Sequence, residues 1–321
     1  MKYGFLTLAA VVSLVVALTM FAAAAPAPMD SIELLSTGRM SDLIGGLSNR
    51  TDPESYHMLA RAYYATEQWD AAIQNAERAV SLRQDDSQYH LWLGRAYGQK
   101  AAEIGNPLSA AGLARKAKNE FERAVELNPR SVSARADLSE YYVEAPAIMG
   151  GGLGKARTQA SAVQSLDPAA ADWILAIAAV KEKKYGDAES RLKSAIATAQ
   201  NPAQYWMNLA SFYRQRGRLD EMQSAINAAV AQPNRPSITY YDAASVLLQA
   251  GRNFPAAAQY VQTYLSSGAL VEDAPAFRAH YLLGEIYEKS GDTAKASAEY
   301  QASLSLASGF SRARKALDQL H

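Results

Sequence analysis

The glycine-rich stretch APAIMGGGLGKA, at residues 145–156, is the part of the sequence that comes nearest to a catalytic motif. Three glycines and a Gly-Lys pair suggest a phosphate-binding loop, in which backbone N–H groups surround the phosphates and a hydroxyl group binds magnesium. That motif needs Gly at the position of Met149 and Ser or Thr at the position of Ala156. The residues before it, ARADLSEYYVE, have a helical pattern, whereas a phosphate loop follows a strand. We therefore interpret the glycines as a turn and expect no nucleotide cofactor.

The other residue types that carry chemistry do not form a recognisable site. The four histidines, His57, His90, His280 and His321, are never three or four residues apart, which disfavours a metal site on one helix. No GxSxG motif is present, and the chain has no cysteine, which excludes disulfides, thiolate zinc sites and a cysteine nucleophile. The paired carboxylates fall on expected turns and outer faces. The sequence therefore predicts neither an enzyme nor a protein with a metal or another cofactor.

Charge and the N-terminus bear on partners and location. Basic and acidic residues both number 32 and no basic run is present, so nucleic acid is not an expected partner. The first 25 residues contain Lys2, an apolar run at 5–21 and then four consecutive alanines at 22–25, which is the pattern of a secretory signal peptide. We expect residues 1–25 to direct export to the periplasm or the medium. The alternative is that residues 5–21 stay uncleaved and anchor the protein in a membrane.

A periodic pattern of large and small residues runs through the rest of the chain. The segment LARAY at 59–63 is followed 34 residues later by LGRAY at 93–97. Large residues four positions apart share one face of a helix, and the small residue beside them lets a partner helix approach closely. A repeat of this length predicts pairs of helices that stack side by side.

With this spacing the chain resembles the tetratricopeptide repeat (TPR) family, whose 34-residue units are helix-turn-helix pairs. The resemblance implies an all-α fold, a right-handed superhelical solenoid of about seven units with a capping helix at its C-terminus. We expect a degenerate helix pair at 26–52, the repeat array at 53–307 and the capping helix at 308–321. The expected units lie near 53–86, 87–130, 131–168, 169–202, 203–236, 237–272 and 273–307.

The resemblance also implies a binding surface. In this family fixed positions on the first helix of each unit line a concave groove that binds peptides or protein segments. In this chain those positions are His57, Arg61, Tyr64, Leu91, Arg95, Gln99, Glu140, Trp173, Ile177, Met207, Arg214, Tyr241, Leu248, Arg278 and Tyr281. The mixture of apolar side chains and arginines suits an extended peptide or a helix of a partner protein. The Lys and Asn with which some family members hold a C-terminal carboxylate are absent from the corresponding positions.

Two units are longer than the repeat length. The second unit has 11 extra residues around Gly105, and Asn106 is expected to cap a helix that begins at Pro107. The resulting hairpin should protrude beside the lengthened turn of the third unit. The apolar residues of the two extensions are Ile104, Leu108, Leu113, Ile148 and Met149. Either the extensions pack on each other, or they form a docking surface for a partner.

Taken together, these patterns favour a non-catalytic scaffold that binds a peptide or protein partner in the concave groove outside the cytoplasm. The alternative is a membrane-tethered spacer or a self-associating array, which would have a polar groove. The third hypothesis is an enzyme, but the sequence lacks the clustered acid and base that catalysis needs.

Overall fold

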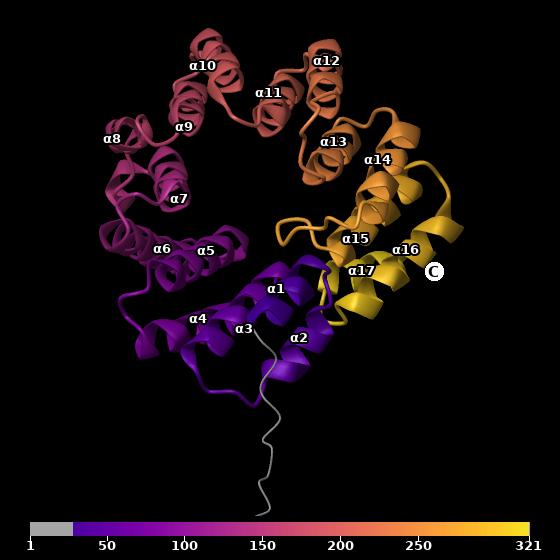
Figure 1. The fold of residues 1–321 in the computed structure, drawn as a ribbon, viewed down its shortest axis with the longest axis horizontal. Helices are drawn as coiled ribbons and strands as arrows, with labels where there is room; N and C mark the ends of the chain where they lie inside the picture. Colours follow the sequence, from indigo (N-terminus) through magenta and orange to yellow (C-terminus); the bar gives the residue numbers. More distant parts are fainter. Residues whose placement is uncertain (1–27, 321) are drawn as a thin grey trace, which may run out of the picture.

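The computed structural model describes residues 28–320, which form helices joined by short turns (Figure 1). Within these residues the helices are α1 (Pro28–Ser36), α2 (Met40–Leu47), α3 (Pro53–Ala65), α4 (Trp69–Leu82), α5 (Ser87–Glu103), α6 (Pro107–Leu127), α7 (Val132–Glu144), the short 3-10 helix η1 (Ala147–Met149), α8 (Leu153–Val163), α9 (Pro168–Lys181), α10 (Tyr185–Thr198), α11 (Ala203–Gln215), α12 (Leu219–Val230), α13 (Ile238–Gln249), α14 (Phe254–Ser266), α15 (Ala276–Lys289), α16 (Thr293–Leu306) and α17 (Ser311–Gln319). The all-α solenoid expected from the sequence is confirmed. The expected signal peptide lies outside the described residues.

The helices are arranged as consecutive pairs around a ring (Figure 1). From α3 onward the first helix of each pair faces the centre of the ring, and the second helix lies on the outside. The inner surface of the ring is therefore built from α3, α5, α7, α9, α11, α13 and α15. Across residues 28–320, no helix is both long enough and apolar enough to cross a membrane.

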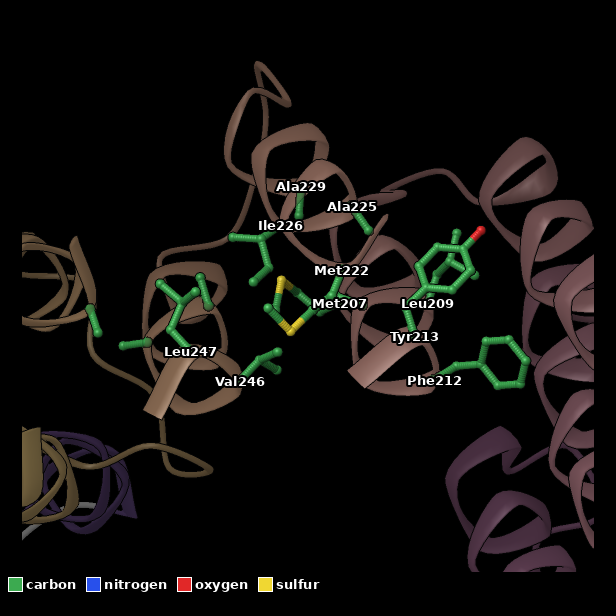
Figure 2. Packing of buried hydrophobic residues seen from close by; sticks show 14 of the residues in the cluster. Met207, Leu209, Phe212, Tyr213, Met222, Ala225, Ile226, Ala229, Val246 and Leu247 are labelled. Carbon is green, nitrogen blue, oxygen red and sulfur yellow. The ribbon is translucent and has the colours of Figure 1, made fainter. Parts of the chain in front are cut away.

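Neighbouring pairs share a continuous apolar core, because a single pair cannot bury both of its faces. Figure 2 shows one part of it, where Met207 of α11 and Met222 of α12 meet near Leu247 of α13. Small residues such as Ala225 and Ala229 lie where the helices approach most closely. These contacts stiffen the wall that carries the inner surface.

The tyrosines that recur in phase with the repeat combine a buried ring with a bonded hydroxyl group. The hydroxyl of Tyr142 donates a hydrogen bond of 2.9 Å to Glu122, and that of Tyr300 donates one of 2.6 Å to Glu288. A buried hydroxyl needs such a partner, since leaving it without one costs about 1–3 kcal/mol. The repeated tyrosines are thus structural residues.

His90 of α5 joins three parts of the second unit. Its Nδ1 lies 2.6 Å from Oε2 of Glu120 in α6, and its Nε2 lies 3.0 Å from the carbonyl oxygen of Gln84. Burial lowers the pKa of His90, but the hydrogen bonds to Glu120 and Gln84 outweigh it, and the net pKa is raised. The imidazolium form can donate to both acceptors at once, which is why it is favoured.

This arrangement predicts a pH dependence of stability. Because the pKa of His90 is raised in the folded state, its contribution is fully present below the unfolded pKa near 6.5 and is lost as the pH rises through the folded value. We expect the melting temperature of the wild type to fall more between pH 6 and pH 8.5 than that of a His90→Gln variant. Thermal unfolding followed by circular dichroism at several pH values measures this difference. Equal slopes for the two proteins would show that the His90 contacts carry no linked proton.

The two ends of the solenoid meet, and this closure was not expected from the sequence. Helices α1 and α2 lie beside α15, α16 and α17 (Figure 1), and the two ends share an apolar cluster. In that cluster Leu35, Met40 and Leu43 pack with Phe277 and Phe310. The C-terminal helix was expected to solvate a free end of the array, but its Ala313 is buried in this cluster. The solenoid is therefore a closed ring.

Close backbone approach and ion pairs complete the closure. Gly38 has a φ of +77°, and a Cβ atom placed on it would lie 2.8 Å from the backbone nitrogen of Ala276, so only glycine fits there. Glu67, in the turn between α3 and α4, lies 2.7 Å from Arg312 and 3.5 Å from Arg278. Arg278 also donates two hydrogen bonds to the carbonyl oxygen of Ala65, at 3.0 and 2.8 Å.

Candidate functional site

A large cavity opens on the inner surface of the ring, between the long hairpin of α5 and α6 and the end of α7. Its volume is about 650 Å³. Small residues of α5 and α6 form its floor, Met149 of η1 forms part of its wall, and charged residues of α5 and α7 lie on the inner side. We call it the alanine pocket; its lining is Tyr64, Arg95, Gly98, Gln99, Ala101, Ala102, Pro107, Ala110, Ala111, Ala114, Ala117, Phe121, Asp137, Glu140, Tyr141, Glu144, Ala145 and Met149.

The long hairpin creates this pocket. α5 has 17 residues and α6 has 21, whereas α3 and α4 of the preceding pair have 13 and 14. Asn106 caps α6 as expected, because its side chain accepts hydrogen bonds from the backbone N–H groups of Leu108 and Ser109 at 3.0 Å. The extra turns extend the alanine-rich faces of α5 and α6 past the neighbouring pair. The pocket is the space between these faces and α7.

The charged groups of the pocket leave one carboxylate without a cationic partner. Arg95 donates a hydrogen bond of 2.6 Å from Nε to Asp137, and Glu144 lies 2.7 Å from Lys181. Glu140 has no ion pair with any residue of the described chain, although its side chain is open to the interior of the ring. Desolvation by the surrounding residues and the nearby charge of Asp137 raise the pKa of Glu140 to about 7. The pocket is thus apolar at its floor and carries a carboxylate that favours a positively charged ligand group.

The expected groove residues fall into three groups. Tyr64, Arg95, Gln99 and Glu140 line the alanine pocket, and Arg61 and Arg278 line a smaller cavity with Tyr64 near the ring closure. A second group is partly buried against the cores of the wall. Its members are Trp173, Ile177, Arg214, Tyr241, Leu248 and Tyr281.

The third group is buried and does not belong to the inner surface. His57, Leu91 and Met207 were placed on the groove by their register, but all three lie inside the wall. The reason is that the next helix covers them: the ring of His57, for example, lies 4.7 Å from that of Tyr89 in α5. Burial and the charge of Arg61 lower the pKa of His57 to about 3, so it is neutral at physiological pH.

The two extensions pack on each other in part and leave apolar residues exposed in part. Met149 lines the pocket opposite the alanines of α6, and Leu113 packs on the core below them. Leu108 and Ile148 are 84% and 93% exposed. Leu108 follows Pro107 and Ile148 precedes Met149, and both of these neighbours line the pocket. Ile104 is the residue that caps the C-terminus of α5 at the tip of the hairpin. The extensions therefore pack on each other through Met149 and Leu113, and a docking role for the exposed Leu108 and Ile148 stays a prediction.

The glycine-rich stretch is a turn whose polar groups are already bonded to the chain. The backbone N–H of Gly152 donates to the carbonyl of Tyr142 at 2.8 Å, and that of Gly151 donates to Pro146 at 3.2 Å. The ammonium group of Lys155 donates to the carbonyl of Gly150 at 2.8 Å. Because these donors are used internally, they do not form a cradle for phosphate.

Gly151 has no room for a side chain. A Cβ atom at this position would lie 1.8 Å from the carbonyl oxygen of Ala145. We expect Gly151→Ala to destabilise the protein by roughly 2–4 kcal/mol, because the turn that holds Met149 against the pocket must move. Urea unfolding measures the loss, and Gly154→Ala, where a Cβ meets no atom within 4 Å, serves as the control. Equal stability of both variants would contradict the tight turn.

Several residues of the site have only weak signals in the sequence. The alanines of the pocket floor lie near the end of α5 and, at helical spacing, in α6 from Ala110 to Ala117, a pattern that indicates helix propensity rather than a pocket. Asp137 was not singled out, although it pairs with Arg95. Within residues 28–320, no cluster of His, Asp and Glu side chains has the arrangement of a metal site.

Comparisons with known proteins agree with the fold. The family model of the tetratricopeptide repeat matches residues 57–103, 174–236 and 241–309, more than half of the chain. No curated protein matches the sequence.

Solved structures give the same class of protein at low similarity. A thermophilic TPR protein of Thermus thermophilus has 21% identity and a TM-score of 0.43, covering 69% of this chain and 100% of its own. A tetratricopeptide repeat protein of Parabacteroides merdae ATCC 43184 has 13% identity and a TM-score of 0.43, covering 88% of this chain and 98% of its own. A chain of the Cut9–Hcn1 hetero-tetramer of APC/C has 13% identity and a TM-score of 0.42, covering 90% of this chain and 55% of its own.

Proposed function

The chain belongs to the tetratricopeptide repeat family, and from this premise we propose that it is a non-catalytic scaffold that binds a segment of a partner protein in the alanine pocket. Proteins of this family are usually interaction modules rather than enzymes. The observation that carries the proposal is the cavity of about 650 Å³ on the inner surface, with an apolar floor and a carboxylate at its mouth. Binding sites of this kind are concave, mostly apolar and supplied with few polar groups.

The chemistry of the pocket suggests the character of the bound segment. The alanines of α6 leave space for one or two large apolar side chains of the partner, whose burial contributes about 25 cal/mol per Å² of apolar surface. Glu140 lacks a cationic partner within residues 28–320, so a Lys or Arg beside those apolar residues would complete the site. Exposed Leu108 and Ile148 extend the apolar contact surface outside the pocket. The proposed ligand is therefore an amphipathic segment with a basic residue next to its apolar face.

The experiment that tests this function fills the pocket. Ala111→Phe places a phenyl ring in the cavity, and Ala197→Phe places the same ring on the exposed face of α10 as a matched control. Each protein is used to capture partners from the native cell envelope, and the retained proteins are identified by mass spectrometry. We expect a protein that is retained by the wild type and by Ala197→Phe, and retained at least tenfold less by Ala111→Phe. Equal retention by all three would exclude the pocket as the docking site.

Glu140 tests the charge of the ligand separately. Glu140→Gln keeps the size of the side chain and removes the charge that a basic residue of the partner would meet. We expect the affinity for the captured protein to fall by a factor of roughly 5–30, the equivalent of about 1–2 kcal/mol for a hydrogen bond to a charged group. Titration of the purified partner measures it. An unchanged affinity would exclude a basic ligand group at Glu140 while leaving the apolar contact possible.

We further propose that the protein acts outside the cytoplasm. The support is the pattern of residues 1–25, in which a basic residue precedes an apolar run and small residues. Cell fractionation combined with intact-mass measurement tests this location. We expect an exported form that has lost its first 24 or 27 residues; a full-length form in the membrane fraction would favour the tethered alternative.

A further inference from the structure

A loop from the far end of the chain lies on the inner surface of the first two units. Residues 267–275, between α14 and α15, project into the middle of the ring (Figure 1). We call this segment the acidic loop, since it contains Glu272 and Asp273. Its base is held by Tyr264, whose hydroxyl donates to the carbonyl of Ala274 at 2.6 Å and accepts the N–H of Val271 at 3.0 Å.

The acidic loop contacts residues that the family resemblance assigned to the peptide-binding groove. Arg61 donates from both Nε and Nη2 to the two carboxylate oxygens of Glu272, with the Nε contact at 2.8 Å. Only 15% of the Arg61 side chain and 24% of the Glu272 side chain are exposed. A paired contact of this kind is the geometry in which an arginine recognises a carboxylate most specifically. The two residues are 211 positions apart, so the contact exists only in the closed ring.

The surface under the loop is built for carboxylates. The guanidinium carbons of Arg61 and Arg95 lie 5.4 and 4.9 Å from the ring centroid of Trp92, one ring serving both arginines. Such stacking fixes the orientation of the guanidinium groups, of which Arg61 donates to Glu272 and Arg95 to Asp137. Arg61, Trp92 and Arg278 surround a cavity of about 230 Å³ that Glu272 and Asp273 also line. We call Arg61, Trp92, Arg95 and Arg278 the arginine patch.

The loop is attracted on one side of the ring and repelled on the other. Asp242 of α13 has no ion pair in the described residues, and burial together with the charge of Asp273 raises its pKa to about 7. Two carboxylates in this proximity disfavour each other's ionised forms. The acidic loop thus combines a paired contact of Glu272 with Arg61 and an unfavourable charge interaction of Asp273 with Asp242.

We propose that the arginine patch is a binding site for an acidic segment of a partner protein, and that the acidic loop occupies this site as an internal competitor. The loop shows the ligand chemistry directly, because a short segment with adjacent carboxylates already binds there. A tethered competitor lowers the apparent affinity of any external ligand by the fraction of time for which the site is free. The inference does not depend on the alanine pocket, because the contact between Arg61 and Glu272 lies outside it, although Arg95 of the patch also lines the pocket.

The test adds the loop sequence as a separate molecule. The probe is a fluorescent peptide SGALVEDAPA with blocked ends, identical to residues 267–276, and the control probe is SGALVQNAPA. Fluorescence anisotropy measures binding to the wild type, to Glu272→Gln/Asp273→Asn, and to the same double variant with Arg61→Ala. The matched control is Asp220→Asn/Glu221→Gln, which removes two adjacent carboxylates from the outer helix α12.

We expect the double loop variant to bind the acidic probe at least tenfold more tightly than the wild type, because an internal ligand that occupies its site for about 90% of the time weakens external binding tenfold. The outer control should match the wild type, and Arg61→Ala and the neutral probe should each abolish the gain. The proposal is overturned if the folded loop variant binds the acidic probe no more tightly than the wild type. It is also overturned if the gain survives Arg61→Ala. Circular dichroism confirms that each variant is folded.

Discussion

Phe310→Ala is expected to open the ring. The Phe310 ring packs edge-on against Phe277 and Tyr281, with centroids 5.1 and 5.2 Å away, and only 2% of the residue is exposed. Truncating a buried Phe to Ala typically costs about 3–5 kcal/mol. We expect part of that loss to fall on the contact between the two ends, because Phe310 belongs to the apolar cluster that also contains Leu35, Met40 and Leu43 of α1 and α2. Small-angle X-ray scattering should show a larger radius of gyration and a longer maximum dimension.

Hydrogen exchange separates ring opening from general destabilisation. A loss of about 3 kcal/mol raises the population of the open form roughly 100-fold, so amides of α1 and α2 that exchange through opening should exchange faster by a similar factor. Phe212→Ala is the control, because Phe212 is equally buried but lies in the wall far from the closure. It should lower the melting temperature without exposing α1 and α2. If both variants expose α1 and α2 equally, the ends are not joined in solution.

Replacing Glu67 by glycine is expected to destabilise the closure even though it relieves backbone strain. Glu67 has a φ of +61°, which disfavours residues with a side chain. Lys183 has the same φ at the same place in another turn, and Gly217 and Gly291 occupy that place elsewhere. Lys183 is exposed, so Lys183→Gly should stabilise the protein by about 1 kcal/mol.

Glu67→Gly should instead cost about 2–3 kcal/mol. The Glu67 side chain is 11% exposed and lies between Arg278 and Arg312, whose side chains are 27% and 55% exposed, so its removal leaves the partly buried charge of Arg278 without this carboxylate and removes the side-chain contacts at the closure. Urea unfolding of the two glycine variants measures the opposite signs directly. A stabilising effect of Glu67→Gly would mean that the relief of backbone strain outweighs any contribution of the carboxylate to the closure.

Much of the fold follows from local sequence patterns. The 34-residue spacing of LARAY and LGRAY predicts helix pairs because it repeats a large-small-large face, and Asn106 with Pro107 marks the start of α6. The lengthened turn at Gly151 is predictable because the phosphate-loop pattern fails at two positions. In each of these cases the signal lies within a few residues of the structure it specifies.

The closure and the site depend on relations that local patterns do not contain. Arg61 and Glu272 meet only because small rotations between successive pairs accumulate around the ring, and neither residue has a signal for the other. The repeat register places Leu91 on the groove, yet it is buried, because the packing of the next helix decides its exposure. The alanine pocket likewise arises from the unequal lengths of neighbouring helices rather than from a motif.

The closed ring gives the inner surface two unlike regions. The arginine patch is covered by the acidic loop, whereas the alanine pocket is open and carries Glu140, which has no ion pair among residues 28–320. In the proposed scaffold an amphipathic basic segment is the ligand of the pocket and an acidic segment is the ligand of the patch. The residues of the two regions lie mainly on α3, α5, α6 and α7 and, through Arg278, on α15.

The most direct test of the proposed function is hydrogen–deuterium exchange of the wild type with and without the protein that it captures. Binding in the alanine pocket predicts that protection increases in the C-terminal half of α5, in the N-terminal half of α6 and in η1, while the outer helices α10 and α12 stay unchanged. The same protection should be absent when Ala111→Phe is mixed with that protein. Protection confined to the outer helices, with none in α5, α6 or η1, would contradict the assignment of the pocket as the partner-binding site.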